Sequence, residues 1–371
     1  MTTDLEPGFQ SLGQATARAI ATRGAIHDRL QRSLLVHGPS GAAKEAFVDD
    51  LLALLFCLDR DPTVRPCNAC RGCRDARARV HPDLVIGSPE RWRAERSSGE
   101  SIVSVARHWL LEAAGAPVVG ERRVVLIEHA DAANEQTQNA LLKALEEPTA
   151  RHMFILVADE PSRLLPTVRS RCQPLRIGPV PRRELVDWLI DRHRVPADQA
   201  DALARLSGGL TGVALAYVRE PELIAWQRRA QAELLALLGK GRADRFGSVR
   251  DLLDDAGRQG SLVPDEASGS DEEGESSRVL AAAQRQGAQR LVAAWVGLTR
   301  DLLMASAGRP DLASAAELSS ELPDLAMRIG PSGWVAFIGL LERIHEGLRE
   351  SGAPRLAMEV AMLEWPPLES R

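Results

Sequence analysis

Apolar residues in the first half of the chain form short continuous runs, separated by longer stretches at helical spacing. The runs at 33–37, 84–86, 124–127 and 153–158 predict buried β-strands, because they are short and mostly apolar, the last one throughout. The stretches between them predict helices at 14–32, 44–58, 103–114 and 131–147, the last capped by Asp131 and ended by Pro148. Strands that alternate with helices in this way predict a parallel α/β domain with right-handed crossovers over residues 1–180.

After Val180 the sequence predicts helices alone. Periodic segments at 182–194, 197–206 and 211–219 predict a small helical domain over 181–220, and apolar stripes at 280–307 and 334–350 predict a further helical domain over 221–371. Between Asp254 and Arg278 eight acidic residues stand against two arginines among glycines and serines, which predicts a disordered acidic insert near 254–278. The expected fold class is therefore α/β plus all-α, in three domains.

The charge balance gives the chain as a whole no strong attraction to nucleic acid or to membranes. Its 371 residues include 46 basic and 51 acidic side chains, for a net charge of −5. No apolar run approaches the roughly 18 residues of a membrane helix, and residues 1–6 lack the pattern of a signal peptide. We therefore expect a cytoplasmic protein without a membrane partner, in which clustered cysteines indicate metal and not disulfides.

Four cysteines form the first candidate site. Cys67, Cys70 and Cys73 make two overlapping C-x-x-C units, and Cys57 precedes them at the end of a predicted helix. Such spacing brings four thiolates around one ion and leaves no open coordination position, so it predicts a structural Zn²⁺ site near 57–73. The alternative is that the thiols are incidental. Cys172 lies far away in the sequence and is expected to be a small packed residue.

The loop after the first predicted strand resembles a phosphate-binding loop with two defects. The segment from Gly38 to Glu45 aligns with the pattern G-x-x-x-x-G-K-[ST]. Ala43 replaces the second glycine, and Glu45 replaces the hydroxyl residue that holds Mg²⁺. Gly38 and Lys44 remain as candidates for binding phosphate, and the alternative is a structural turn without a nucleotide. We expect ATP binding by this chain to be weak or absent.

Two further positions bear on ATP hydrolysis. Glu128-His129 follows the strand at 124–127, where an active P-loop ATPase has an Asp-Glu pair, and neutral His129 is a poor substitute for a carboxylate that orients water. Ser170-Arg171-Cys172 is a short arginine loop, and a guanidinium suits phosphate because its planar fork gives two parallel hydrogen bonds. A solvated surface arginine is the alternative for Arg171. The pattern predicts a chain that does not hydrolyse ATP but offers Arg171, with Ser170 beside it, to a neighbour's nucleotide.

These features in this order resemble the delta-prime subunits of bacterial DNA polymerase III clamp loaders, a family of AAA+ proteins. The resemblance runs from about Phe9 to Leu215, and it also includes Gly13-Gln14, His81-Pro82-Asp83 and the run from Asn139 to Pro148. Gamma and tau subunits share that last run and the arginine loop, but they have intact phosphate loops, and a lid arginine where this sequence has Gly212. These departures favour the delta-prime family over the gamma/tau family.

The resemblance implies an AAA+ domain at 1–180, a helical lid at 181–220 and a helical collar at 221–371. It implies a non-hydrolysing stator whose Arg171 acts in trans on ATP bound by gamma or tau, with delta as another partner. The sliding clamp and primed DNA are then partners of the assembly, and the DNA-directed DNA polymerase activity belongs to the holoenzyme. The alternatives are an active AAA+ ATPase of the gamma/tau type and a zinc-bearing nucleic-acid-binding module.

Overall fold

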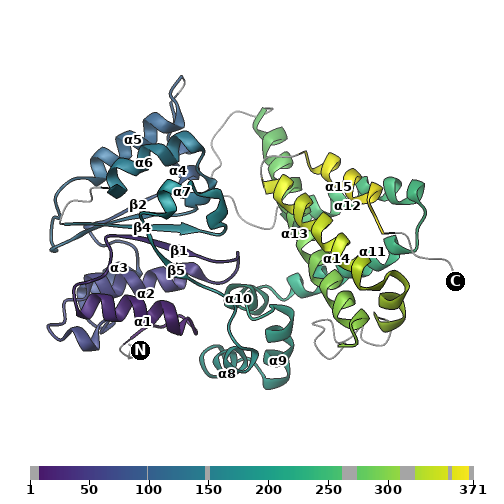
Figure 1. Ribbon diagram of the computed structural model, residues 1–371, viewed down its shortest axis with the longest axis horizontal. Helices are drawn as coiled ribbons and strands as arrows, with labels where there is room; N and C mark the ends of the chain where they lie inside the picture. The colour runs from purple at the N-terminus through teal and green to yellow at the C-terminus, as the bar shows by residue number, and fades with distance from the viewer. Residues whose placement is uncertain are drawn as a thin grey trace. The chain divides into compact units, whose positions relative to one another are not determined.

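The computed structural model describes residues 8–97, 99–146, 151–260, 274–309, 322–349 and 353–366. The chain forms two compact units, Met1–Ala216 and Tyr217–Arg371. The first unit combines a β-sheet with helices, and the described part of the second is helical (Figure 1). The fold class predicted from the sequence, α/β plus all-α, is confirmed.

The sheet of the first unit has five parallel strands in the order β2-β3-β4-β1-β5. Their bounds are β1 (Ser33–His37), β2 (Leu84–Gly87), β3 (Arg123–Ile127), β4 (His152–Ala158) and β5 (Gln173–Arg176). Because all five run the same way, the loops that follow β1, β3 and β4 meet at one edge of the sheet, which is where α/β folds place their ligands. The strand β5 was not predicted, since only Leu175 of its four residues is buried and Pro174 interrupts the pattern.

Helices cover both faces of this sheet (Figure 1). One face packs against α1 (Ala15–Ile26), α2 (Lys44–Phe56) and α3 (Arg71–Arg77), and the short 3-10 turn η1 (Pro62–Val64) precedes α3. The other face carries α4 (Pro89–Ala94), α5 (Ile102–Ala113), α6 (Glu135–Glu146) and α7 (Pro166–Arg169), with the 3-10 turns η2 (Ala130–Ala132) and η3 (Pro161–Arg163). Successive side chains of a strand point to opposite faces of the sheet, so they enter the hydrophobic cores on either side of it. Leu34 lies in the core beside α1 and α2, and Leu35 lies in the core beside α5 and α6.

The cap of α6 lies three residues later in the chain than expected. Asn134 is its cap, since the Asn134 side-chain oxygen accepts a hydrogen bond from the backbone N–H of Thr137 at 2.9 Å. The buried carboxylate of Asp131 instead accepts hydrogen bonds from the backbone N–H groups of Asp159 and Glu160, at 3.1 and 2.8 Å. Asp131 therefore joins the end of β3 to the end of β4, and the predicted capping role for it is wrong.

The remaining helices of the first unit follow β5. They are α8 (Arg182–His193), α9 (Ala197–Leu206) and α10 (Thr211–Arg219), and the last extends into the second unit. The glycines before α10 are needed for a close approach: Gly209 has φ 81°, and a β-carbon on it would lie 2.5 Å from the carbonyl oxygen of Val180. The start of α10 is thereby brought back toward the end of the sheet domain.

The second unit contains α11 (Glu222–Leu238), α12 (Arg242–Gly260), α13 (Gly274–Ser306), α14 (Leu322–Arg349) and α15 (Pro354–Leu363). Its core is built around Trp295 and Trp334, whose indole N–H groups donate to the carbonyl oxygens of Ala230 and Ala326, both at 2.9 Å. Within α14 the backbone leaves helical geometry at Gly330, directly before Pro331.

The predicted acidic insert near 254–278 differs from the structure at both ends. The helix α12 continues to Gly260 and α13 begins at Gly274, and residues 261–273 lie outside the described part of the chain. Periodic apolar residues on either side, such as Leu253 in the core, carry the helices further than composition alone indicated. Among the described residues no helix is long and apolar enough to cross a membrane.

Candidate functional site

The phosphate-type loop lies between β1 and α2 and has two constrained backbone positions. A β-carbon on Gly38 would lie 1.8 Å from the carbonyl oxygen of Ile177, so only glycine fits there. Ala43 has φ 57° and ψ 47°, the left-handed conformation that glycine adopts freely. An L-residue pays roughly 1–2 kcal/mol for that conformation. Alanine has replaced glycine here, but the backbone has kept the form that glycine favours.

Lys44, the residue that would meet a phosphate, is engaged inside the chain. Its Nζ lies 2.5 Å from Oδ1 of Asp159 and 3.1 Å from the carbonyl oxygen of Pro39, and its side chain is only 3% exposed. Asp159 directly follows β4, so the pair spans the edge of the sheet where the phosphates of a nucleotide would lie. A phosphate can recruit Lys44 only by separating this buried ammonium group from its carboxylate partner, which is costly.

A second ion-pair network closes the metal side of the same site. Arg79, two residues after the end of α3, reaches Oδ1 of Asp49 at 2.9 Å and Oε1 of Glu128 at 2.6 Å. Glu128 stands where an ATPase would hold Mg²⁺, and here its carboxylate binds a guanidinium of the same chain. The cavity left in this region is about 30 Å³ and is lined by Lys44, Glu45, Arg79, Glu128, His129 and Asp159 among others. That volume is roughly the share of one water molecule.

The start of α10 covers the phosphate-type loop. The backbone N–H of Gly212 donates to the carbonyl oxygen of Gly41 at 2.9 Å, and the hydroxyl of Thr211 donates to the carbonyl oxygen of Ala42 at 3.3 Å. A β-carbon on Gly212 would lie 2.8 Å from the Gly41 oxygen, so the position where gamma and tau would place an arginine has no room for a side chain.

We expect the isolated chain to bind Mg-ATP weakly or not at all. Binding would require Lys44 to leave Asp159 and Glu128 to leave Arg79 before any phosphate contact forms. Calorimetric titration of the purified chain at submillimolar Mg-ATP should show little heat, with an active gamma/tau-type subunit as the positive control. A micromolar Kd, or turnover by the chain alone, would establish the active-ATPase alternative.

The four clustered cysteines form a separate site at the end of α2 and the start of α3. The Sγ atoms of Cys57, Cys67, Cys70 and Cys73 all lie within 4.8 Å of one another, and those of Cys67 and Cys73 are 4.0 Å apart. A tetrahedral zinc site with bonds of about 2.3 Å places its sulfur atoms about 3.8 Å apart. The cluster therefore has dimensions that could hold a metal ion, as the spacing predicted.

Backbone donors point at these sulfur atoms. The N–H groups of Cys67, Cys70 and Cys73 lie 3.4 Å from the Sγ atoms of Cys57, Cys67 and Cys70 respectively. Burial raises the pKa of Cys67, but hydrogen bonds from the N–H groups of Cys70 and Ala69 outweigh it and lower that pKa to about 7. These donors favour the thiolate at Cys67, the form in which cysteine binds metal, whereas burial raises the pKa of Cys57 and of Cys73.

The segment after the cluster ties it to the rest of the α/β unit. Arg77, at the end of α3, lies 2.6 Å from Oδ1 of Asp50, which is fully buried in α2. The same carboxylate accepts hydrogen bonds from the backbone N–H groups of Gln10 and Ser11, at 2.8 and 2.7 Å. Arg77 and Arg79 were not singled out in the sequence, although two arginines directly after a cysteine cluster are a usable signal. We call the segment from Cys57 to Arg79 the cysteine module. Its last two arginines thus pair with the carboxylates of Asp50 and Asp49 in α2.

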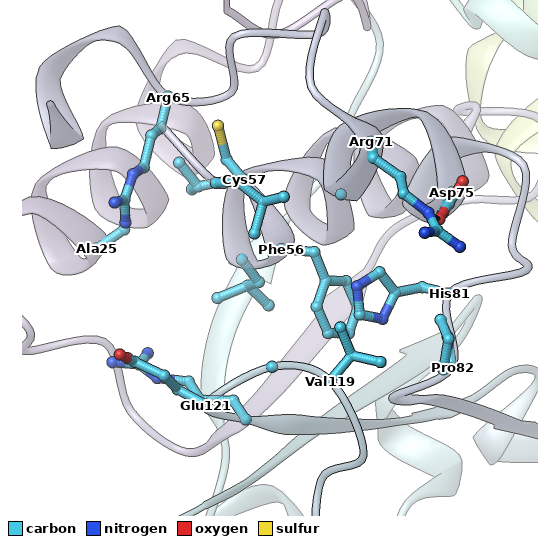
Figure 2. Close-up of a pocket in the computed structure, with 16 residues that line it drawn as sticks. Ala25, Phe56, Cys57, Arg65, Arg71, Asp75, His81, Pro82, Val119 and Glu121 are labelled. Atoms are coloured by element: carbon cyan, nitrogen blue, oxygen red, sulfur yellow. Dashed lines mark hydrogen bonds and ion pairs between the residues drawn. The ribbon is translucent and has the colours of Figure 1, made fainter. Parts of the chain in front are cut away.

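A pocket of about 500 Å³ opens beside the cysteine module and is shown in Figure 2. Its floor includes the rings of Phe56 and His81, stacked with centroids 3.8 Å apart. Asp83 accepts hydrogen bonds from the backbone N–H groups of Val118, Val119 and Gly120. Burial raises the pKa of Asp83, but these three hydrogen bonds outweigh it and hold the pKa below its usual value. The His81-Pro82-Asp83 motif therefore packs the module against β2 and fixes the loop before β3.

The arginine loop lies between α7 and β5. Cys172 is buried in the core beneath it, as expected of a small packed residue, whereas Ser170 is exposed. The hydroxyl of Ser170 and Nη1 of Arg171 both donate to the carbonyl oxygen of Thr167, at 3.1 and 2.8 Å. Nη2 of Arg171 lies 2.5 Å from Oε1 of Glu146, and the arginine remains 34% exposed. Arg171 is not among the residues that line the cavity at Lys44.

Two glutamines connect elements of the first unit, and the sequence marked only one of them, Gln14 in the Gly13-Gln14 motif. Gln138 in α6 donates to the carbonyl oxygens of Ala133 and Arg163, at 2.9 and 3.1 Å, and accepts from the N–H of Leu165 at 2.7 Å. It thereby fixes α6 to the segment that leads into the arginine loop. Gln14 exchanges two hydrogen bonds with the backbone of Gly178, at 2.8 and 3.0 Å, which accounts for the Gly13-Gln14 motif.

The features described so far define an AAA+-like module. They are a parallel sheet of this strand order, a phosphate-type loop after β1, helices folded back on that loop and an arginine loop before the last strand. In this one Lys44 is paired with Asp159 and Glu128 with Arg79, and a pocket of about 210 Å³ remains on the other side of the loop, beside Ala43. Its class is that of AAA+-like proteins with a degenerate phosphate loop.

Residues 13–181 match the family model described as DNA polymerase III, delta subunit. The chain is 36% identical to the delta' subunit of Pseudomonas aeruginosa over 177 residues, which is 47% of this chain and 52% of the relative. It is 33% identical to the delta' subunit of Escherichia coli over 225 residues, 61% of this chain and 62% of the relative. A gamma subunit-related protein from Thermotoga maritima aligns over 89% of this chain and 99% of its own, with 15% identity and a TM-score of 0.37.

The chain therefore spans about half the length of the first of these relatives and less than two thirds of the second. Over residues 13–181 it is similar to the DNA polymerase III delta-subunit family, and the predicted resemblance to delta-prime subunits is confirmed.

Proposed function

We propose that the chain is a non-hydrolysing delta-prime subunit of a DNA polymerase III clamp loader. The observation that carries the proposal is the internal pairing of two groups at the phosphate-type loop, Lys44 with Asp159 and Glu128 with Arg79. A subunit whose own phosphate-binding groups are bound internally contributes to ATP use only through a neighbour. Its partners are gamma/tau and delta subunits, and the sliding clamp and primed DNA are bound by the assembly.

Arg171 is the group through which the subunit acts on a neighbour's ATP. Its guanidinium lies on a short loop with a buried anchor at Cys172, and it is partly open to solvent. An arginine held at a subunit edge stabilises the charge that develops on a transferred γ-phosphoryl group, and it stays protonated throughout. Ser170 supports the loop by hydrogen bonding to the same carbonyl oxygen as Arg171.

The metal of the cysteine cluster is Zn²⁺, held by Cys57, Cys67, Cys70 and Cys73. Four thiolates and a tetrahedral ion leave no position for water or substrate, so the ion supplies folding energy and no catalysis. The module then holds Arg77 and Arg79 against α2 and keeps the nucleotide site closed.

Omission of this chain from a reconstituted loader is the test of the proposed function. A mixture of gamma/tau, delta, sliding clamp and primed DNA should load the clamp poorly, and adding the chain should restore loading and produce a complex that elutes as one species. The Lys44→Ala variant loses the ion pair with Asp159 and should melt at a lower temperature, but below that temperature it should restore loading as well as the natural chain, because Lys44 serves no nucleotide. Loading that is equally efficient without the chain contradicts the proposal.

A further inference from the structure

The side chain that contacts Arg171 lies on a different element from the arginine loop. Glu146 is the last residue of α6, and its Oε1 is 2.5 Å from Nη2 of Arg171. The other terminal nitrogen, Nη1, donates to the carbonyl oxygen of Thr167 at 2.8 Å. The guanidinium is therefore held at both Nη atoms, by a carboxylate on one side and by a carbonyl on the other.

This arrangement leaves donors for a ligand. An arginine has five N–H groups in a fixed plane, and the contacts described for Arg171 use one on each Nη. The remaining three, among the described residues, are left for another acceptor, and the side chain is 34% exposed. A guanidinium that is held at both Nη atoms keeps its remaining N–H groups in one plane and in one direction, and these groups can donate to the oxygen atoms of a phosphate.

The two holding groups are themselves fixed to one body. Gln138 joins α6, which carries Glu146, to the segment before α7, which carries Thr167. Leu141 and Leu145 of α6 pack in the same core as Val168 and Cys172. The carboxylate and the carbonyl thus keep a constant spacing, and the arginine between them is restricted to one orientation.

We propose that Glu146 is a positioning residue for Arg171: its carboxylate pre-organises the guanidinium for the neighbour's phosphates. This inference rests on the proposed function, since the effect of Glu146 is measured through Arg171. Pre-organisation lowers the entropy lost when the fork meets its ligand, so its loss reduces the rate of the chemical step more than it weakens ATP binding.

The test uses loaders assembled with Glu146→Ala, Glu146→Gln, Arg171→Ala and the double variant Glu146→Ala/Arg171→Ala. We expect Glu146→Ala to lower kcat at the adjoining ATP site about two- to fivefold, with KM for ATP unchanged, because an exposed ion pair of up to about 1 kcal/mol changes the population of one orientation by that factor. Glu146→Gln should restore part of the loss, because an amide oxygen still accepts from Nη2. The double variant should match Arg171→Ala, since Glu146 then has nothing to position.

The control is Glu112→Gln, which removes an exposed carboxylate paired with His108 on α5 and should leave kcat unchanged. Thermal melting of Glu146→Ala should stay within about 2 °C of the natural chain, because an exposed pair contributes little stability. Natural kcat in Glu146→Ala beside a reduced rate in Arg171→Ala overturns the inference and leaves the proposed function standing. An increase in kcat, or a change in KM alone, also overturns it. Natural activity in Arg171→Ala overturns the proposed function itself.

Discussion

Replacing Arg171 by alanine should lower the ATPase rate of an assembled loader on clamp and primed DNA, while the subunit stays folded and assembles. The side chain is partly exposed and its ion pair lies at the surface, so folding depends little on it. Arginine fingers in other systems contribute roughly 10³ to 10⁵ in rate. Only the site next to this chain loses its finger directly, so the bulk rate falls less and clamp loading falls more if the sites act in order.

Two further variants separate a finger from a general charge effect. Arg171→Lys should rescue poorly, because a compact ammonium cannot reproduce the planar fork. Arg163→Ala removes an arginine from the preceding 3-10 turn and should leave the rate unchanged. Equal ATPase rates for Arg171→Ala and the natural chain in an assembled complex would falsify the trans role.

Replacing Cys70 by serine should release the zinc ion and destabilise the first unit. Cys70 is the N-cap of α3, and its sulfur receives N–H groups from both Leu58 and Cys73 at 3.4 Å. Without the ion α3 loses its anchor, and Arg77 can no longer cover the buried Asp50. An uncovered buried carboxylate costs about 3–5 kcal/mol, which lowers the Tm of a unit of this size by roughly 10 °C.

Metal analysis beside thermal melting measures both parts of this expectation. The natural chain, purified under reducing conditions, should carry one zinc ion, and Cys70→Ser should carry none. Cys172→Ser is the matched control: it changes a buried cysteine outside the cluster and should keep the metal, whatever its melting temperature. Absence of zinc from the freshly purified natural chain would remove the metal from the account.

Much of the α/β unit could be predicted because its signals are local. The apolar runs marked four strands, and the C-x-x-C spacing of Cys67, Cys70 and Cys73 marked a metal cluster before any geometry was known. Both depend on residues close together in the sequence, where period and spacing are direct consequences of backbone geometry. The strand β5 escaped because a short edge strand buries too few side chains to leave a pattern.

The contacts that close the nucleotide site could not be predicted, because each joins residues that are far apart in the sequence. The defects at Ala43 and Glu45 indicated a weak site, but nothing local showed that Asp159 would capture Lys44. The partner of Arg171 was hidden in the same way, since Glu146 lies in a run that the sequence marked for family resemblance and not for contact. Ion pairs between elements depend on the register of the sheet and the packing of its helices.

The most direct test of the central claim is the single-turnover rate of ATP hydrolysis by gamma/tau-type subunits as this chain is titrated into a mixture with delta, clamp and primed DNA. The natural chain should raise the rate until one copy per complex is present. The Arg171→Ala variant should assemble to the same stoichiometry without raising the rate at the adjoining site. An equal rise with Arg171→Ala, or hydrolysis by this chain in the absence of the other subunits, would rule out a subunit that acts only through a neighbour's ATP.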